Sequence, residues 1–152
     1  MEENKQAVRK IGISVPEWRE LVKSGCEIPV ETTLDGTSMQ PFIRRGLDTV
    51  TVCPLRRKPK RGDIVLFVDH RGKHVVHRVY KTEQNTVWTL GDGCNAPDPP
   101  VSYEDIGGIV TQVRRGNRTV NTDTAFSRLL GKIWMSSLFL RPAMHRVYKL
   151  FK

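Results

Sequence analysis

The stretch Gly36-Thr37-Ser38-Met39-Gln40-Pro41 decides how this chain is interpreted, because three further short motifs follow it in order. Gly62-Asp63-Ile64-Val65 comes next, then His77-Arg78-Val79, and then Gly91-Asp92 with Asp98 six residues further on. Each motif lies beside a run of strand-forming residues. A serine, a histidine and an acid are the side chains from which an activated nucleophile is built. We therefore expect a β domain that carries the side chains of an activated nucleophile.

The distribution of apolar residues predicts the fold around these motifs. Short β-branched runs, separated by turns and charged connectors, are typical of antiparallel hairpins and cover residues 30–34, 49–53, 64–68, 75–80, 87–90 and 109–113. Residues 16–24 have the start and stop signals of a short helix, and apolar residues recur at helical spacing after residue 120. We predict an N-terminal helical segment (1–29), a β domain (30–120) and a basic amphipathic helical tail (121–152).

The stretch from Leu34 to Val113, about half the chain, resembles the signal peptidase I superfamily, which also contains the LexA-type self-cleaving repressors. The family motifs run roughly as Gly-x-Ser-Met-x-Pro, Gly-Asp-Ile-Val, a strand that bears the general base, and Gly-Asp-Asn-Asn with a following acid. The resemblance implies a mainly β fold with a signal-peptidase-like antiparallel sheet or barrel. It also implies serine endopeptidase activity on a leader or signal peptide.

The His77-Arg78-Val79 context is similar to the Ser-His branch of the superfamily, the endoplasmic-reticulum and sporulation type, rather than to the Ser-Lys branch. By this resemblance Ser38 is the nucleophile and His77 is the general base. Asp98 corresponds to the acid that orients the histidine, and Asp92 to a structural or assisting aspartate. The sequence alone leaves open which of these two acids contacts His77.

Two features depart from the family pattern. The fourth motif has Gly93-Cys94 where the family has Asn-Asn, and the serine motif is not preceded by an apolar helix of membrane-spanning length. We expect neither a transmembrane segment nor a secretory signal peptide in this chain. With three cysteines at unrelated spacings, we favour a reducing compartment and a cytoplasmic or peripheral membrane location.

Other residues compete for the role of the base. Lys73 and Lys81 flank the His77 strand, so that a Ser-Lys pair stays open, although a catalytic lysine must be desolvated to lose its proton. His70 and His74 lie at or beside a predicted hairpin tip, where exposure is expected. His74 and His77 should point to opposite faces of a strand, which disfavours a zinc site. We therefore expect no metal and no other cofactor.

The net charge of +9 is concentrated at the C-terminal end. Residues 114–152 contain nine basic residues and one acid, so that this segment accounts for +8. A cationic amphipathic segment is typical of a helix that lies on an anionic membrane. We expect peripheral membrane contact through residues 124–152, with a helix packed on the β domain as the alternative. No pattern indicates nucleic-acid binding.

The sequence thus predicts an endopeptidase that forms an acyl-enzyme on Ser38 and binds an extended peptide. Two other functions remain open. One is a catalytically degenerate module that captures an extended peptide without cutting it. The other is a protein that processes itself.

Overall fold

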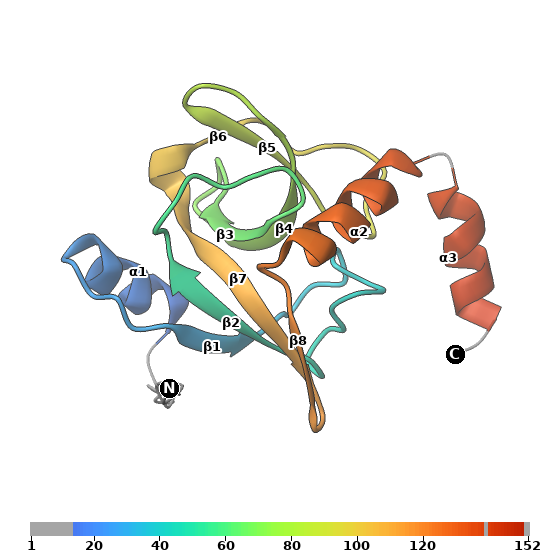
Figure 1. The fold of residues 1–152 in the computed structure, drawn as a ribbon, viewed down its shortest axis with the longest axis horizontal. Coiled ribbons are helices and arrows are strands. Elements are labelled where there is room, and N and C mark those ends of the chain that lie inside the picture. Colours follow the sequence, from blue (N-terminus) through green and yellow to red (C-terminus); the bar gives the residue numbers. More distant parts are fainter. Residues whose placement is uncertain (1–13, 139, 151–152) are drawn as a thin grey trace.

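The computed structural model describes residues 14–138 and 140–150, and its fold is mainly β, as the sequence predicts (Figure 1). A curved antiparallel sheet forms a half-barrel, with a short helix before it and helices after it. In chain order the elements are α1 (Val15–Lys23), β1 (Val30–Thr33), β2 (Thr49–Pro54), β3 (Ile64–Val68), β4 (His74–Thr82), β5 (Thr86–Leu90), β6 (Val101–Ser102), the 3₁₀ helix η1 (Tyr103–Asp105), β7 (Ile106–Arg115), β8 (Arg118–Asn121), α2 (Ala125–Ser136) and α3 (Arg141–Leu150).

The sheet has the strand order β1-β2-β7-β3-β4-β5-β6, and all of its pairs are antiparallel. The long strand β7 pairs with β2 along one edge, and along its other edge with β3 and then with β8. The short strands β6 and β8 have no counterpart among the predicted runs. β1 stands at one end of the order and pairs with β2 alone among the described strands, so its other edge is open.

The sheet buries apolar side chains on both faces, because neighbouring residues of a strand point in opposite directions. In β3, Ile64 and Leu66 join one buried cluster, whereas Val65 and Phe67 join the other. The first cluster also holds Trp18 of α1, whose indole Nε1 donates to the Ile28 carbonyl at 2.7 Å. Burial on both faces holds the side chains of β3 and of the central part of β4, residues 76–79, in defined directions.

The helix α2 packs against the turn that precedes β3. Gly62 has a φ of +98°, and a Cβ placed there would lie 2.6 Å from the backbone oxygen of Arg128 in α2. The N-cap of α2 is Thr124, whose hydroxyl accepts from the Ser127 amide. Thr122, two residues earlier, donates its hydroxyl to the Val110 carbonyl.

Pro142 lies in the first turn of α3 and does not interrupt a continuous helix, because α2 has already ended at Ser136. No helix within the described residues is long and apolar enough to cross a membrane.

Candidate active site

Ser38 lies in the loop that follows β1, and its neighbour holds it in place. Met39 is fully buried in the first apolar cluster, and the backbone turns through hydrogen bonds from Gln40 to Thr37 and from Ile43 to Met39. Within the described part of the chain, the backbone N–H of Ser38 donates to no other residue. Burial of Met39 therefore anchors the loop, while the hydroxyl and the amide of Ser38 stay available to a bound molecule.

His77 projects from β4 towards Ser38. The strand alternation places it on the same face as Val75 and Val79, and its ring contacts Phe67 with centroids 6.1 Å apart. The side chain is mostly buried, and its Nε2 lies 2.9 Å from Ser38 Oγ. The approach is thus set by β4, which carries His77, and by the buried Met39, which anchors the loop of Ser38.

Asp98 contacts the other nitrogen of the same ring. Its Oδ2 lies 2.6 Å from His77 Nδ1 and also accepts from the Thr89 hydroxyl at 2.6 Å. The backbone amide of Asp98 donates to the Thr89 carbonyl, which ties the acid to the end of β5. Burial raises the pKa of Asp98, but the hydrogen bonds from His77 and Thr89 outweigh it and hold that pKa below its usual value.

This geometry selects one tautomer of His77. An ionised Asp98 is an acceptor only, so Nδ1 carries the proton that it shares with the carboxylate. Nε2 is then the acceptor for the Ser38 hydroxyl proton. Ser38, His77 and Asp98 together form a series in which a base can remove the serine proton and a carboxylate stabilises the resulting imidazolium.

Asp92 lies in the same loop but does not contact the His77 ring in the described structure. It is fully buried and accepts two hydrogen bonds from Arg78, to Oδ1 and Oδ2, each 2.8 Å long. Its backbone carbonyl accepts from the Trp134 indole. Asp98 is therefore the acid that touches the base, and the role that the resemblance implies for Asp92 remains a prediction.

Two glycines allow the acid-bearing loop to press against Ser38. The Gly93 amide donates to the Ser38 carbonyl at 2.7 Å. A Cβ added at Gly91 would lie 2.7 Å from that carbonyl and 3.1 Å from His77 Nε2. By contrast, a Cβ at Gly36 would meet no atom within 4 Å, so Gly36 is not needed for close backbone packing. The sequence marked the Gly91 motif, but it gave no sign of this contact with Ser38.

The sequence did not indicate three residues that support the loop. These are Thr89 of β5 and, from the C-terminal helices, Trp134 and Arg141. The sequence contains a weak indication for Thr89, because a threonine two residues before the fourth motif can point into the sheet. The other two lie more than thirty residues from that motif, and no local pattern connects them to it.

The competing bases lie elsewhere. Lys81 forms an ion pair with Glu83 and lies over the Trp88 ring, and its side chain is more than half exposed. Lys73 and His70 are exposed at the hairpin tip. His74 points away from His77, and burial, together with the nearby charge of Arg19, lowers its pKa. Among the described residues, no group of His, Cys, Asp and Glu side chains could hold a metal ion.

Cys94 is half-buried near the site, and burial followed by the charge of Asp98 raises the pKa of its thiol. A raised pKa disfavours the thiolate, which is the nucleophilic form of cysteine. The surroundings of Cys94 therefore do not activate its thiol.

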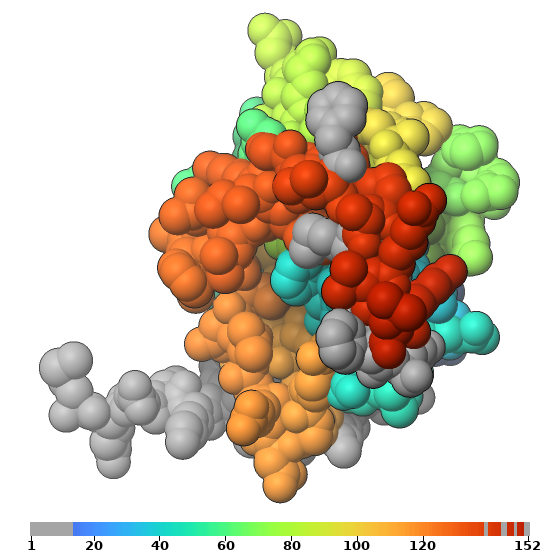
Figure 2. All heavy atoms as spheres, turned by 90° about the vertical axis from the view of Figure 1, so that its right-hand side faces the viewer, coloured from blue at the N-terminus to red at the C-terminus, as the bar shows by residue number. Residues whose placement is uncertain are grey.

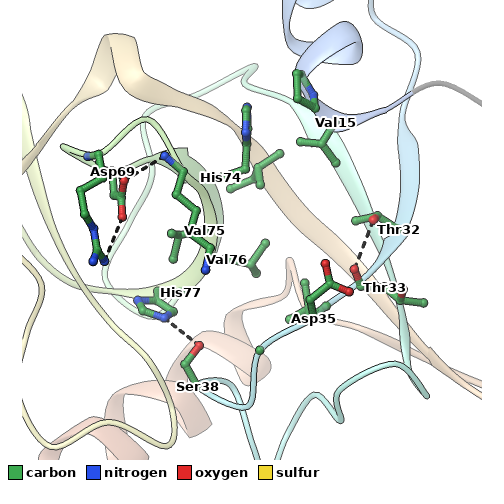
Figure 3. A pocket seen from close by; sticks show the side chains of 16 residues that line it. Val15, Thr32, Thr33, Asp35, Ser38, Asp69, His74, Val75, Val76 and His77 are labelled. Atoms are coloured by element: carbon green, nitrogen blue, oxygen red, sulfur yellow. Dashed lines mark hydrogen bonds and ion pairs between the residues drawn. The ribbon is translucent and has the colours of Figure 1, made fainter.

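A hollow of about 490 Å³ opens beside Ser38 and His77. Figure 3 shows these two side chains pointing towards each other at one end, with Val15 of α1 at the other end. Thr32 and Thr33 at the open edge of β1 form one wall, and residues 73–77 of β4 and its preceding turn form the opposite wall. The hollow therefore joins an unpaired strand edge to the Ser38 hydroxyl.

Comparisons of the chain with protein-family models, with curated proteins and with solved structures gave no match. The resemblance to signal peptidases therefore rests on the motif residues alone.

Proposed function

We propose that the chain is a serine endopeptidase of the signal-peptidase type, which cleaves a leader or signal peptide through an acyl-enzyme on Ser38. The observation that carries this proposal is the hydrogen-bonded series from Ser38 through His77 to Asp98. Three residues from separate segments meet at hydrogen-bonding distance in the order that nucleophilic catalysis requires. The signal-peptidase type is supported by the four sequence motifs.

In the proposed reaction, His77 Nε2 takes the proton of Ser38 as Oγ attacks the scissile carbonyl carbon. Asp98 stabilises the imidazolium, which then gives its proton to the leaving amine. Water, deprotonated by His77, hydrolyses the acyl-enzyme in the same way. The backbone N–H of Ser38, which donates to no other described residue, is a donor for the oxyanion that forms in both steps. Base catalysis of this kind contributes about 10²- to 10⁴-fold to the rate.

The proposed substrate is an extended peptide that adds a strand to the open edge of β1. Strand addition supplies main-chain hydrogen bonds, and the walls of the hollow would select side chains. By the family resemblance, small residues are expected on the amino side of the cleaved bond. The reaction as proposed uses no cofactor.

Labelling by a fluorophosphonate tests the activated serine without knowledge of the substrate. We expect the native chain to label on Ser38, and Ser38→Ala and His77→Ala to lose the label. Lys73→Ala and Lys81→Ala are the matched controls and should label as the native chain does. If His77→Ala labelled fully and either lysine variant lost the label, the general base would be that lysine and not His77.

The same variants distinguish the two remaining functions. A degenerate peptide-binding module would bind an extended peptide without labelling at Ser38. A self-processing protein would lose mass over time after purification, and Ser38→Ala would keep its full mass.

We also propose that the C-terminal helices bring the enzyme to an anionic membrane surface. One face of α2 packs inward through Trp134 and Met135, whereas the opposite face exposes Phe126, Leu129 and Ile133, each more than half exposed. α2 and α3 lie across one side of the molecule (Figure 2), and their residues Lys132 and Lys149 are also exposed. Exposed apolar side chains among cations are the features by which an interfacial helix binds anionic lipid.

Co-sedimentation with vesicles tests the membrane proposal. We expect the native chain to pellet with anionic vesicles and much less with zwitterionic ones. The triple variant Phe126→Ser, Leu129→Ser, Ile133→Ser should stay in solution. Leu21→Ser is the control, because Leu21 is an exposed apolar residue of α1, away from α2 (Figure 1). Equal and negligible pelleting of the native chain and the triple variant would refute membrane binding.

A further inference from the structure

Arg141, the first residue of α3, has no exposed surface. Its guanidinium lies 5.5 Å from the centre of the Trp134 ring, and Nη1 donates to the backbone carbonyls of Gly91, at 3.2 Å, and of Cys94. Within the described residues it forms no ion pair with a carboxylate. Nη2 donates to the Trp134 carbonyl at 3.5 Å, and Nε has no hydrogen-bond partner among the described residues. A buried cation is costly unless donors are satisfied, so the contacts of Nη1 and Nη2 hold the guanidinium in a defined position.

The two carbonyls belong to the loop formed by residues 91–98, which carries Asp98 at its far end. Trp134 of α2 binds the same loop, because its indole donates to the Asp92 carbonyl at 2.9 Å. The C-terminal helices therefore hold three carbonyls of the loop, at residues 91, 92 and 94. An arginine suits this task, since Nη1 can donate to the Gly91 and Cys94 carbonyls at once while Nη2 donates to the Trp134 carbonyl and the planar group lies beside the Trp134 ring.

The end of the loop that Trp134 and Arg141 hold, residues 91–94, is also the end that touches the catalytic serine. The Gly93 amide, between the clamped carbonyls, donates to the Ser38 carbonyl. Beyond residue 94 the loop is more exposed, and the Asp98 amide then returns to Thr89. Displacement of the clamped half would thus reach both Ser38 and Asp98, although Arg141 contacts neither of these side chains in the described structure.

We propose that Arg141 is a positioning residue that fixes the loop of residues 91–98 against Ser38 and thereby places Asp98 on His77, which makes the C-terminal helices part of the active site. The effect of Arg141 on catalysis rests on the proposed peptidase function, whereas its effect on the loop does not. A displacement of about 1 Å in such a site can lower a rate about 10²-fold.

The test compares Arg141→Met with Arg146→Met in the full chain. Arg146 is an exposed arginine of the same helix, so both variants lose one positive charge and gain the same side chain. We expect the fluorophosphonate labelling rate of Ser38 to fall about 10²-fold in Arg141→Met and to stay unchanged in Arg146→Met. Arg141→Lys, which keeps the charge but loses the guanidinium, should recover only part of the rate. Equal rates in the native chain and Arg141→Met would overturn the proposal.

A second readout separates positioning from a general loss of stability. Proton NMR of the native chain should show a low-field signal from the His77 Nδ1 proton in its short bond to Asp98. In Arg141→Met this signal should weaken or disappear, and the Gly93 and Asp98 amides should exchange about tenfold faster, while the amides of β3 and β7 keep their protection. Unchanged loop exchange, or equally faster exchange throughout the sheet, would refute a positioning role.

These NMR and exchange measurements do not depend on any reaction. If the native chain fails to label, the peptidase proposal falls, and the loop exchange still decides whether Arg141 holds the loop. If the native chain labels and Arg141→Met labels equally well, the peptidase proposal stands and the positioning proposal falls.

Discussion

Arg78 and Asp92 face each other in a doubly hydrogen-bonded ion pair beneath the loop of the candidate site, and both side chains are almost completely buried. Arg78 also donates to the Gly62 carbonyl and packs against Gly131 of α2. The pair thus connects β4, the loop and α2. Arg78 follows His77 in the chain, and Asp92 belongs to the loop that carries Asp98. The pair therefore supports the candidate site residues, although it forms no hydrogen bond with Ser38 among the described residues.

Replacement of Asp92 by Asn should therefore destabilise the fold. The substitution leaves the Arg78 guanidinium buried without its countercharge, which typically costs about 3–5 kcal/mol. Urea unfolding measures the loss, and the exposed pair of Lys23 and Glu20 gives the control, since Glu20→Gln should leave the midpoint unchanged. Equal midpoints for Asp92→Asn and the native chain would show that the pair contributes little.

Asp98→Asn should leave the protein folded and almost inactive. The amide is close to the carboxylate in size, but it no longer holds His77 in the tautomer that accepts the serine proton. In a site of this kind such a change lowers the rate about 10⁴-fold. The measurement is the rate of fluorophosphonate labelling, with circular dichroism as the check on folding. A rate within tenfold of the native value would exclude Asp98 as the residue that orients His77.

Gly91→Ala should disable the site because the added methyl group collides with neighbouring atoms, although the substitution removes no reacting group. Its Cβ would lie 2.7 Å from both the Ser38 carbonyl and the Cys94 sulfur, so the loop must move. We expect Ser38 labelling to fall about 10²-fold, as for other small displacements of catalytic groups. Gly36→Ala, which has open space around the added methyl group, should retain native labelling and thermal stability. Tolerance of alanine at position 91 would mean that the loop relaxes freely.

The carboxyl group of Asp48 should make the free energy of unfolding depend on pH. Burial raises the pKa of Asp48, but hydrogen bonds from Arg115 and Arg44 outweigh it and hold the pKa far below its usual value. An unfolded aspartate has a pKa of about 3.9, so below about pH 4 the unfolded chain binds a proton that the native protein does not. The stabilisation of the fold by the ionised Asp48 is therefore complete at neutral pH and is lost on acidification.

Urea unfolding between about pH 6 and pH 3 measures this dependence. The free energy of unfolding should fall as the pH drops, and it should fall less in Asp48→Asn, which has no carboxyl group to titrate. The same slope in both proteins would assign the acid sensitivity to other carboxylates.

The sequence predicted the strands that are buried on both faces because they are long and rich in β-branched residues. β3 was expected at residues 64–68 and is found at those residues. β6 has two residues, and β8 is exposed throughout, so neither has the apolar pattern on which such a prediction depends. Both strands exist because a longer neighbour offers them an open edge.

The motifs indicated three site residues, Ser38, His77 and Asp98, and these lie in contact in the structure. A nearby strand fixes each of them. The support from α2 and α3 could not be predicted. Trp134 and Arg141 look in sequence like the apolar and basic faces of one amphipathic helix. Only the turn between the two helices directs both side chains inward onto the loop.

The order of these residues along the chain has a consequence for protein synthesis. A ribosome makes Ser38 first, then His77, then Asp98, and Arg141 last. A nascent polypeptide therefore contains the Ser38 hydroxyl well before it contains the arginine that binds the neighbouring loop. If the chain is a peptidase and that arginine acts as we propose, the growing chain stays much less active than the finished protein until translation has passed α3.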